Sequence, residues 1–400
     1  MQTPSQPEVN PWLVLLLAVG CGLIVANIYY AQTLVGPISL ALGMPPAAAG
    51  LVVTLTQIGY GLGLLFVIPL GDYVENRALV LGSVALSALS MLGAAFSPSA
   101  TLFLLCALLT GISSVAVQVL VLYAAHMAHD GIRGRVVGNV MSGLMLGIML
   151  ARPVASLVAD MASWRAVYLC AALAMLLMLG VLRLALPQRQ PHSPIGYRAL
   201  MGSMVALALQ MPLLRLRALC HACLFAAFSL FWTVVPLHLA QHFGMRQRGI
   251  ALFALAGVAG AIAAPLAGRM ADRGWTRPAT LTAMLLVAVA LLLAQLEWGG
   301  GSGSLQLALL VAAAIVLDAG VSSHLVLSQR VIFALGAAQR GRCNALFMAT
   351  FFAGGALGSA LGGWSYAQGG WSQAAWVGLV FPLLALGYFW GVGRTAARVR

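Results

Sequence analysis

Residues 133–147, RGRVVGNVMSGLMLG, recur in outline at residues 340–354, RGRCNALFMATFFAG. Both segments begin with Arg-Gly-Arg, and the second begins 340 − 133 = 207 positions after the first. The same offset relates further pairs of identical residues: Met141 and Met348, Gly147 and Gly354, Leu150 and Leu357, and Trp164 and Trp371. An offset of 200 relates two charged pairs: Asp72 and Asp272, and Arg77 and Arg277. A chain that repeats itself at about half its length is expected to fold as two similar units.

Hydrophobic residues make up 62% of the 400-residue chain, and charged residues only 7%. A soluble domain carries about 25% charged residues, so lipid is the expected solvent of a chain this long. Three tracts contain no Asp, Glu, Lys or Arg: 11–71, 78–129 and 343–393. Each tract is long enough for two spans of about 20 residues with a turn between them. The composition therefore predicts an all-α polytopic membrane protein embedded in a lipid bilayer.

Clusters of Pro, Gly and Arg divide the chain into twelve predicted membrane spans. Their bounds lie near 11–33, 47–70, 78–96, 100–127, 136–160, 163–186, 216–240, 249–268, 278–296, 304–328, 342–363 and 370–393. Six spans fall in an N-terminal bundle, residues 1–186, and six in a C-terminal bundle, residues 216–400. The linker between them, residues 187–215, is apolar from Ala199 to Leu214. That part is short for a span, so we expect a cytoplasmic linker with an amphipathic helix on the membrane surface.

The distribution of arginine predicts the orientation of the chain. All 21 basic residues are arginines, and the net charge is +13. With twelve spans and the N-terminus inside, Arg165, Arg246 and Arg248 lie outside and Arg152 lies within a span, which leaves 21 − 4 = 17 on the cytoplasmic side. This is the positive-inside pattern, so both termini are expected in the cytoplasm. Because the basic residues lie in short loops between spans, nucleic acid is not an expected partner.

Two six-span units with corresponding loops on one side form a parallel repeat, which is an architecture of transporters. Four segments carry a more specific resemblance: PLGDYVENR (69–77), RGRVVGNVMSG (133–143), GRMADRGWTR (268–277) and RGRCNALFMATFFAGGALGSALGG (340–363). In these segments the chain resembles bacterial members of the major facilitator superfamily, and among them drug–proton antiporter-like exporters. The resemblance covers nearly the whole chain. It implies twelve helices in two pseudo-symmetric halves, located in the bacterial inner membrane.

From this resemblance we expect a secondary-active exporter that moves small hydrophobic or amphipathic molecules in exchange for protons, by alternating access. Its partners are then a small-molecule substrate and protons, without a cofactor or a metal ion, and the protein is expected to be a monomer. A proton-coupled uptake symporter of the same fold is the alternative, because the residues do not specify direction. An intramembrane enzyme is disfavoured, because only Asp318 is a deeply buried acid and His324 lies on nearly the opposite helix face.

Asp72 and Arg77 fall at the motif that the superfamily carries between spans two and three. A carboxylate there can accept hydrogen bonds from free amides at the start of a neighbouring helix and complement its dipole. The resemblance implies that this neighbour is span eleven and that Asp72 latches the halves together in the outward-facing state. Ordinary loop charge that sets topology is the alternative. The counterpart of this latch in the second half comprises Asp272, Arg273 and Arg277.

The run AAAIVLDAGVSSHLVLSQR, residues 312–330, holds one carboxylate, Asp318, deep in a predicted span. An acid that is wet in one conformation and dry in another can carry a proton, because burial penalises its charged form. We therefore expect Asp318 to couple protons to transport; a permanently protonated acid bonded to Ser322 is the alternative. Arg152, in the outer half of span five, is expected to face a polar cavity and to take part in the coupling, unless its side chain only reaches toward the membrane surface. The two residues differ in predicted depth, so a permanent ion pair between them is not expected.

Polar and aromatic residues on the helices that line the family's central cavity are the candidate substrate contacts. The N-terminal half supplies Asn27, Tyr29, Tyr30, Gln32 and Gln118. The C-terminal half supplies a stripe on one face of span seven: His221, Phe225, Phe228 and Trp232. Aromatic walls with few polar groups suit aromatic or amphipathic compounds, whereas simple packing is the alternative. Glycines are frequent in spans five and eleven, where they favour either a sliding surface between the halves or static packing.

Overall fold

The computed structural model describes residues 10–129, 132–191, 196–260, 262–296, 303–335 and 339–398. Helices make up nearly all of this part of the chain, which contains no strand. The N-terminal half consists of α1 (Pro11–Ala26), α2 (Tyr30–Ala41), α3 (Leu51–Leu62), α4 (Asn76–Ala95), α5 (Ala100–Ser113), α6 (Ala116–Met127), α7 (Arg133–Met161) and α8 (Trp164–Ala185), with short helical turns η1 (Pro46–Ala48), η2 (Gly63–Val67) and η3 (Ile68–Asp72). The remainder consists of α9 (Tyr197–Gln210), α10 (Pro212–His242), α11 (Gln247–Gly260), α12 (Ala263–Asp272), α13 (Thr276–Leu293), α14 (Gly303–Phe333) and α15 (Arg340–Arg398).

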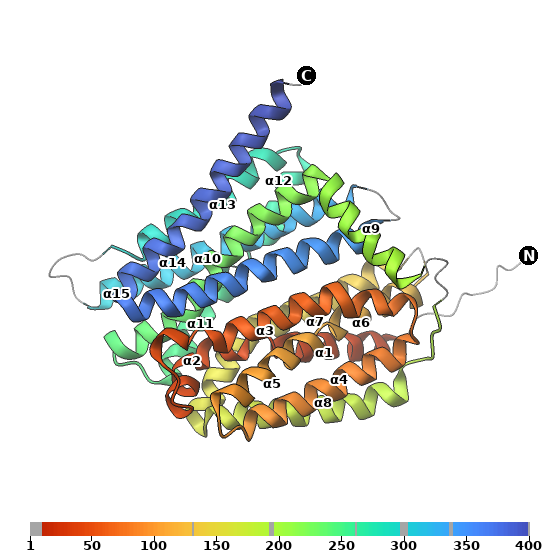
Figure 1. Ribbon diagram of the computed structural model, residues 1–400, viewed down its shortest axis with the longest axis horizontal. Coiled ribbons are helices and arrows are strands. Elements are labelled where there is room, and N and C mark those ends of the chain that lie inside the picture. The colour runs from red at the N-terminus through yellow and green to blue at the C-terminus, as the bar shows by residue number, and fades with distance from the viewer. Residues whose placement is uncertain are drawn as a thin grey trace, which may run out of the picture.

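The described residues contain eleven helical segments that are long and apolar enough to cross a membrane. The last of them, Arg340–Gly391, is 52 residues long. It leaves helical geometry at Gly369 and Gly370, where Gly370 adopts a φ of +66°. The chain turns back on itself at this point (Figure 1), so α15 supplies two passes and the described residues make twelve passes in all. The all-α class predicted from the composition is confirmed.

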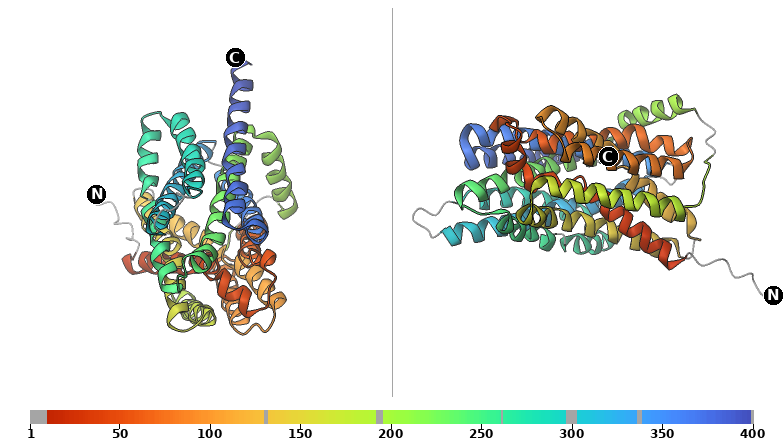
Figure 2. Two further views of the ribbon diagram at one scale, coloured as in Figure 1. Left: turned by 90° about the vertical axis from the view of Figure 1, so that its left-hand side faces the viewer. Right: turned by 90° about the horizontal axis from the view of Figure 1, so that it is seen from below.

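The two halves of the chain form two bundles that lie against each other. In Figure 1, α1 to α8 lie in the lower part and α10 to α15 in the upper part, and the left view of Figure 2 shows the same separation. The internal repeat is visible in the packing. A Cβ atom on Gly147 of α7 would collide with the backbone of Gly22 in α1, and one on Gly354 of α15 would collide with the backbone of Ala222 in α10. These two glycines therefore allow close packing of helices within each half.

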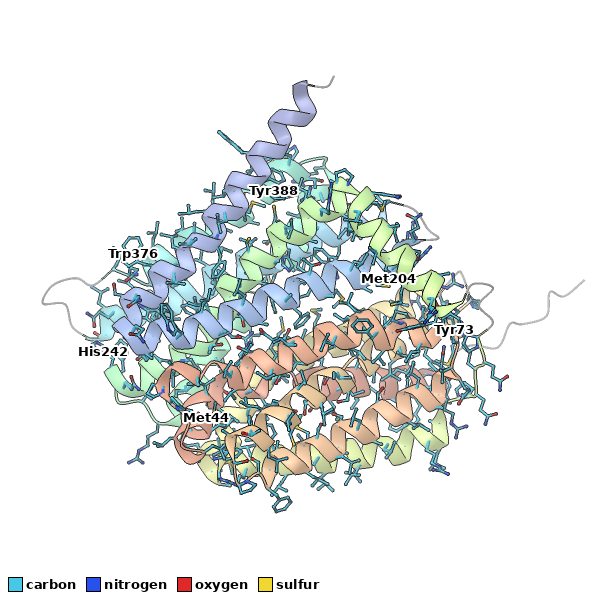
Figure 3. The ribbon with its side chains drawn as sticks, viewed as in Figure 1. Met44, Tyr73, Met204, His242, Trp376 and Tyr388 are labelled. Atoms are coloured by element: carbon cyan, nitrogen blue, oxygen red, sulfur yellow. The ribbon has the colours of Figure 1, made fainter. Side chains whose placement is uncertain are left out.

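The loops rich in arginine gather at one end of the molecule. Figure 3 shows Tyr73 and Met204 at this end, and Met44 and His242 at the other. We call the first the arginine-rich end and the second the opposite end. Among the arginines counted with the loops, Arg217 is an exception: it is buried in α10, and its Nη1 donates to Thr280 Oγ1 at 2.9 Å.

Helix α9 of the linker lies across the two halves at the arginine-rich end. Tyr197 donates from its hydroxyl to the carbonyl oxygen of Phe66 in the N-terminal half at 3.0 Å. Arg342 of the C-terminal half donates to Ser203 Oγ at 2.7 Å. Met204 is buried beneath the helix, whereas Val205 on its outer face is 60% exposed. It ends at Gln210, four residues before the predicted Leu214, because Met211 breaks the helix and Pro212 begins α10.

Polar contacts join the halves at the opposite end. Thr54 Oγ1 lies 2.8 Å from Ser359 Oγ, and Gln57 Nε2 donates to Ser229 Oγ at 2.8 Å. Between α7 and α11, Ser156 Oγ donates to Gln247 Oε1 at 2.7 Å, and the backbone N–H of Arg248 donates to Asp160 Oδ1 at 3.2 Å. This conformation is therefore closed at the opposite end.

Candidate functional site

A cavity of about 360 Å³ lies between the halves. Its walls come from α1, α3, α6 and α7 on one side and from α10, α11, α14 and α15 on the other. It extends to Val137, Asn344 and Phe333, which lie near the ends of α7, α15 and α14 that face the arginine-rich end. The cavity thus reaches from the centre of the molecule toward that end, and the contacts described above close it at the other.

One wall of the cavity is aromatic. Phe225 stacks on Phe228 with ring centroids 5.2 Å apart and meets Phe351 edge-on at 4.9 Å. Phe352 continues the cluster, 4.7 Å from Phe351 and 4.5 Å from Tyr60 of the N-terminal half. Such pairs are rigid and bury large apolar surfaces. Phe225 and Phe228 were expected in this wall; Tyr60, Phe351 and Phe352 were not.

The facing wall on α7 is built from methionines. Met141, Met145 and Met149 line the cavity, together with Met348 of α15. Their spacing of four residues places the three α7 methionines on one helical face, and this spacing could have identified them in the sequence. Methionine is flexible and polarizable, so it adapts to ligands of different shape.

The cavity ends at a buried cluster of Arg152, Asp318 and Trp232, here called the charge cluster. Arg152 Nη1 lies 3.8 Å from Asp318 Oδ2, and both side chains are less than 10% exposed. Trp232 donates from Nε1 to Asp318 Oδ1 at 3.0 Å. Because Arg152 belongs to α7 and Asp318 to α14, the pair connects the two halves.

Aromatic rings surround the guanidinium of Arg152. Its Cζ atom lies 4.1 Å from the ring centre of Trp232, 5.1 Å from that of Phe228 and 5.9 Å from that of Tyr29. Cation–π contacts of this kind contribute about 0.5–2 kcal/mol each, depending on how far they exclude water. Arg152 therefore does not reach to the membrane surface, which was the alternative considered from the sequence.

The expectation that depth keeps Arg152 and Asp318 apart was wrong. Counted from the arginine-rich end, Arg152 is the 20th residue of α7 and Asp318 is the 16th of α14. Four residues of helix correspond to about 6 Å along the axis, a distance that an arginine side chain spans. The partner of Asp318 is also Trp232 rather than Ser322.

Two glycines of α11 allow the close approach to Asp318. A Cβ atom on Gly257 would collide with Asp318 Oδ2 and would lie 3.0 Å from Trp232 Cζ2 and 3.1 Å from Arg152 Nη1. One on Gly260 would lie 2.6 Å from Asp318 Cβ. Small residues are therefore required on this face of α11.

His221 lines the cavity and pairs with His324. Their Nδ1 atoms are 3.1 Å apart, and the two rings are stacked with centroids 5.2 Å apart. His324 is fully buried and also lies 3.3 Å from Ser328 Oγ, so it faces away from Asp318. Within the described part of the chain, no three His, Cys, Asp or Glu side chains lie close enough to share a metal ion.

The remaining candidate cavity residues are placed differently. Gln118 lines the cavity and donates to Tyr60 OH at 3.1 Å. Asn27 donates to Ser87 Oγ at 3.1 Å within its own half, and neither it nor Tyr30 is part of the cavity wall. In this region α1 ends at Ala26 and α2 begins at Tyr30. Tyr29, which lies between the two helices, is part of the cavity wall.

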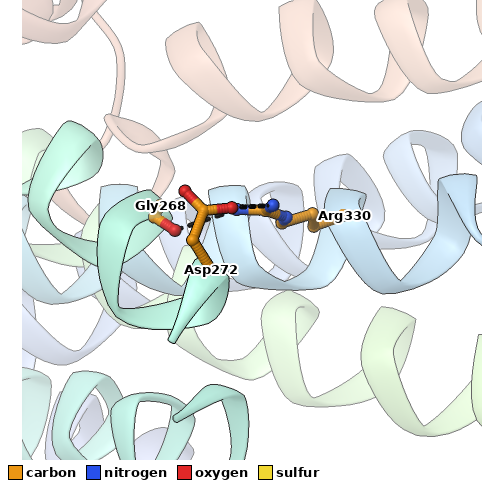
Figure 4. Close-up of polar contacts among 3 residues, drawn as sticks. All are labelled: Gly268, Asp272 and Arg330. Carbon is orange, nitrogen blue, oxygen red and sulfur yellow. Dashed lines mark hydrogen bonds and ion pairs between the residues drawn. The ribbon is translucent and has the colours of Figure 1, made fainter. Parts of the chain in front are cut away.

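The candidate latch residues do not connect the halves in this conformation. Asp72 is exposed and makes no polar contact with another described residue, and Arg77 donates to the carbonyl oxygen of Arg183 in its own half. Asp272 pairs with Arg330, which also donates to Gly268 O at 2.8 Å (Figure 4). All three of these residues belong to the C-terminal half. The two other members of the predicted set are exposed: Arg273 and Arg277.

Comparisons with known proteins agree with this architecture. Residues 15–215 and 217–399 match the family model of the Major Facilitator Superfamily. The uncharacterized transporter YgaY of Escherichia coli O157:H7 is 38% identical over 389 residues, which cover 97% of each chain. The probable transporter SCO4007 of Streptomyces coelicolor is 32% identical over 362 residues, which cover 89% of this chain and 82% of that protein.

The fold is also found in solved structures. A bacterial homologue of the human lysosomal transporter Spinster, in an inward-facing and occupied conformation, superimposes with a TM-score of 0.75 over 97% of this chain and 98% of that one. The sequence identity is 15%, so this likeness concerns the fold alone. With the family match over both halves, the relatives named as transporters and a cavity between two repeated bundles, the chain belongs to the major facilitator superfamily of membrane transporters.

Proposed function

We propose that this chain is a proton-coupled secondary transporter of small hydrophobic or amphipathic molecules, whose two halves rock about the cavity. The observation that carries the proposal is the Arg152–Asp318 pair, which is buried, joins the halves and lies at the closed end of an apolar cavity. Ionisable residues at membrane depth are expensive and mark substrate or proton pathways. The aromatic and methionine walls support an apolar substrate.

Asp318 is the proposed proton site. A proton on its carboxylate would remove the negative charge that faces Arg152 and so weaken the contact between the halves at this point. A ligand shifts a conformational equilibrium only by its different affinity for the two states. Asp318 is 4% exposed here, and separation of the halves at the opposite end would bring it into contact with water. The proton affinity of Asp318 would then differ between the two conformations, because its environment changes from buried to wet.

We further propose that the arginine-rich end lies in the cytoplasm of a bacterial cell and that the protein acts as a monomer in the inner membrane. The arginine distribution supports this orientation by the positive-inside rule. In that orientation the present conformation gives access to the cavity from the cytoplasm. Asp72 then lies at the cytoplasmic surface, where it is proposed to latch the halves in the opposite conformation.

Two directions of transport are compatible with a proton at Asp318. Export in exchange for protons follows from the resemblance to drug–proton antiporters, and it requires that proton and substrate exclude each other from the site. Uptake together with protons is the second candidate, and the contact of 3.8 Å between Arg152 and Asp318 favours it. A proton on Asp318 would leave Arg152 free to bind a substrate, so that both bind together.

The test is transport by the purified full-length chain in proteoliposomes with an imposed pH gradient. Three probes share one ring system and differ in charge: 2-naphthoate, 2-naphthamide and 2-naphthylmethylamine. We expect accumulation of at least one probe against its concentration gradient, beyond the flux into protein-free vesicles. Movement against the proton flow indicates exchange, and movement with it indicates symport. If no probe shows gradient-dependent flux, the proposal is wrong.

A further inference from the structure

The two charged members of the charge cluster are not equally well paired. Asp318 accepts a hydrogen bond from Trp232 at 3.0 Å. Its nearest distance to Arg152 is 3.8 Å, which is longer than a hydrogen bond. The guanidinium donates no hydrogen bond to any described residue, and its Nε is fully buried without a partner among them. The cation, rather than the carboxylate, is therefore the underused partner.

A guanidinium carries five N–H donors in one plane. The rings of Trp232 and Phe228 lie within cation–π distance of the Arg152 Cζ atom, and Nε has no hydrogen-bond partner among the described residues. A buried donor without a partner is destabilising, and more so when it is charged. A planar carboxylate matches the fork of donors and can bind two of them at once.

We infer that the substrate is a small amphipathic organic anion whose carboxylate binds Arg152 and whose apolar body lies between the phenylalanine and methionine walls. This inference rests on the proposed function, because it takes the cavity as the substrate site. The cavity volume of about 360 Å³ lies at the lower end of the roughly 300–1,000 Å³ seen for ligand pockets, which suits a body of one or two fused rings. A cationic substrate is disfavoured, since Arg152 already occupies the faces of Trp232, Phe228 and Tyr29.

Binding to the full-length chain in lipid nanodiscs, measured by isothermal titration calorimetry, tests the inference without any transport step. We expect 2-naphthoate to bind at least about tenfold more tightly than 2-naphthamide, as expected for a hydrogen bond to a charged group. Arg152→Gln is expected to remove this preference. Arg152→Lys keeps the buried charge but not the fork of donors, so it is expected to retain only part of the preference.

Arg165→Gln is the matched control. Arg165 also lies over a tryptophan ring, 4.2 Å from the centre of Trp164, but it is not part of the cavity wall. This variant is expected to keep the full preference for 2-naphthoate. The inference is overturned if 2-naphthoate does not bind, if the amide or the amine binds as tightly, or if the preference survives in Arg152→Gln.

Failure of this inference and failure of the proposed function give different experimental results. Gradient-driven transport of the amide or the amine, with no binding preference for the carboxylate, would refute the inference and leave the proposed function standing. Carboxylate binding that depends on Arg152, without gradient-driven flux of any probe, would support the inference for the site and refute proton-coupled transport.

Discussion

Asp318→Asn tests the proposed proton coupling most directly. Asparagine has the size of aspartate and keeps an oxygen that can accept the hydrogen bond from Trp232, which is 3.0 Å long in the native chain. It has no negative charge and does not titrate. We therefore expect the variant to lose proton-driven accumulation of the transported probe, while exchange of that probe down its own gradient survives.

The size of the perturbation follows from the geometry of the pair. Two unit charges separated by the 3.8 Å between Arg152 and Asp318 attract each other by about 4 kcal/mol at an effective dielectric constant of about 20. Removing one partner of a buried pair typically costs about 3–5 kcal/mol, because the other charge stays buried. The conformation in which this pair joins the halves is then disfavoured by a factor on the order of 10²–10⁴. In Arg152→Gln/Asp318→Asn no charge is left unpaired, and most of this loss is expected to be recovered.

The assays are flux in proteoliposomes with and without a pH gradient, and thermal unfolding of the purified chain for both single variants and the double variant. Insertion and yield in the membrane fraction control for folding. The coupling role of Asp318 is refuted if Asp318→Asn still concentrates the probe against its gradient. The energetic argument fails if the single variants are as stable as the native chain, or if the double variant is less stable than either.

Three further predictions follow from the fold. Gly257→Ala places a methyl group against the charge cluster, so we expect a loss of about 1–3 kcal/mol of stability and reduced flux; Gly138→Ala, where a Cβ meets nothing within 4 Å, is the control that should change neither. Asp72→Asn should lower flux several-fold with normal expression, and native flux in that variant would remove the latch assignment. With single cysteines at Val205 and His242, a membrane-impermeant thiol reagent should label the first from the cytoplasm and the second from outside; labelling of Val205 only from outside would contradict the proposed orientation.

The fold could be predicted because its determinants lie along the sequence itself. The membrane spans follow from tracts without charge, such as 343–393, and the two halves follow from the offset between the two Arg-Gly-Arg segments. Neither prediction depends on the direction in which a side chain points. The site depends on helix phase and on the reach of side chains. Both Tyr29 and Tyr30 were candidates from the sequence, and only Tyr29 lines the cavity.

The charge cluster shows that contacts between residues far apart in the sequence are also hard to predict from residue spacing. Helical rise separates Arg152 and Asp318, and only the length of the arginine side chain brings the two charges within 3.8 Å. Trp232 was expected to contact substrate as part of a stripe with Phe225 and Phe228. In the structure it lies behind the cavity wall and binds Asp318 instead. Contacts between different helices, both across the two halves and within one half, were therefore the part of the site that residue spacing could not supply.

The sense of coupling can be read from how protons affect binding of the anionic probe. A carboxylate at Arg152 would lie next to Asp318, because the two side chains are 3.8 Å apart, and two negative charges at one guanidinium repel each other. Substrate anion and proton are then expected to bind together, so the affinity for 2-naphthoate should rise as the pH falls toward the titration of Asp318.

Other titratable groups lie nearby: His221 lines the cavity, Tyr29 faces Arg152, and His324 lies behind His221. The pH dependence of binding is therefore assigned to Asp318 only if Asp318→Asn abolishes it and leaves tight binding at all pH values. Isothermal titration calorimetry of the native chain and of this variant between pH 5 and pH 8 decides the matter. Tighter binding at low pH in the native chain alone favours symport, because proton and substrate then occupy the same state. Weaker binding at low pH would mean that they compete, as export in exchange for protons requires, and the argument for joint binding would be wrong.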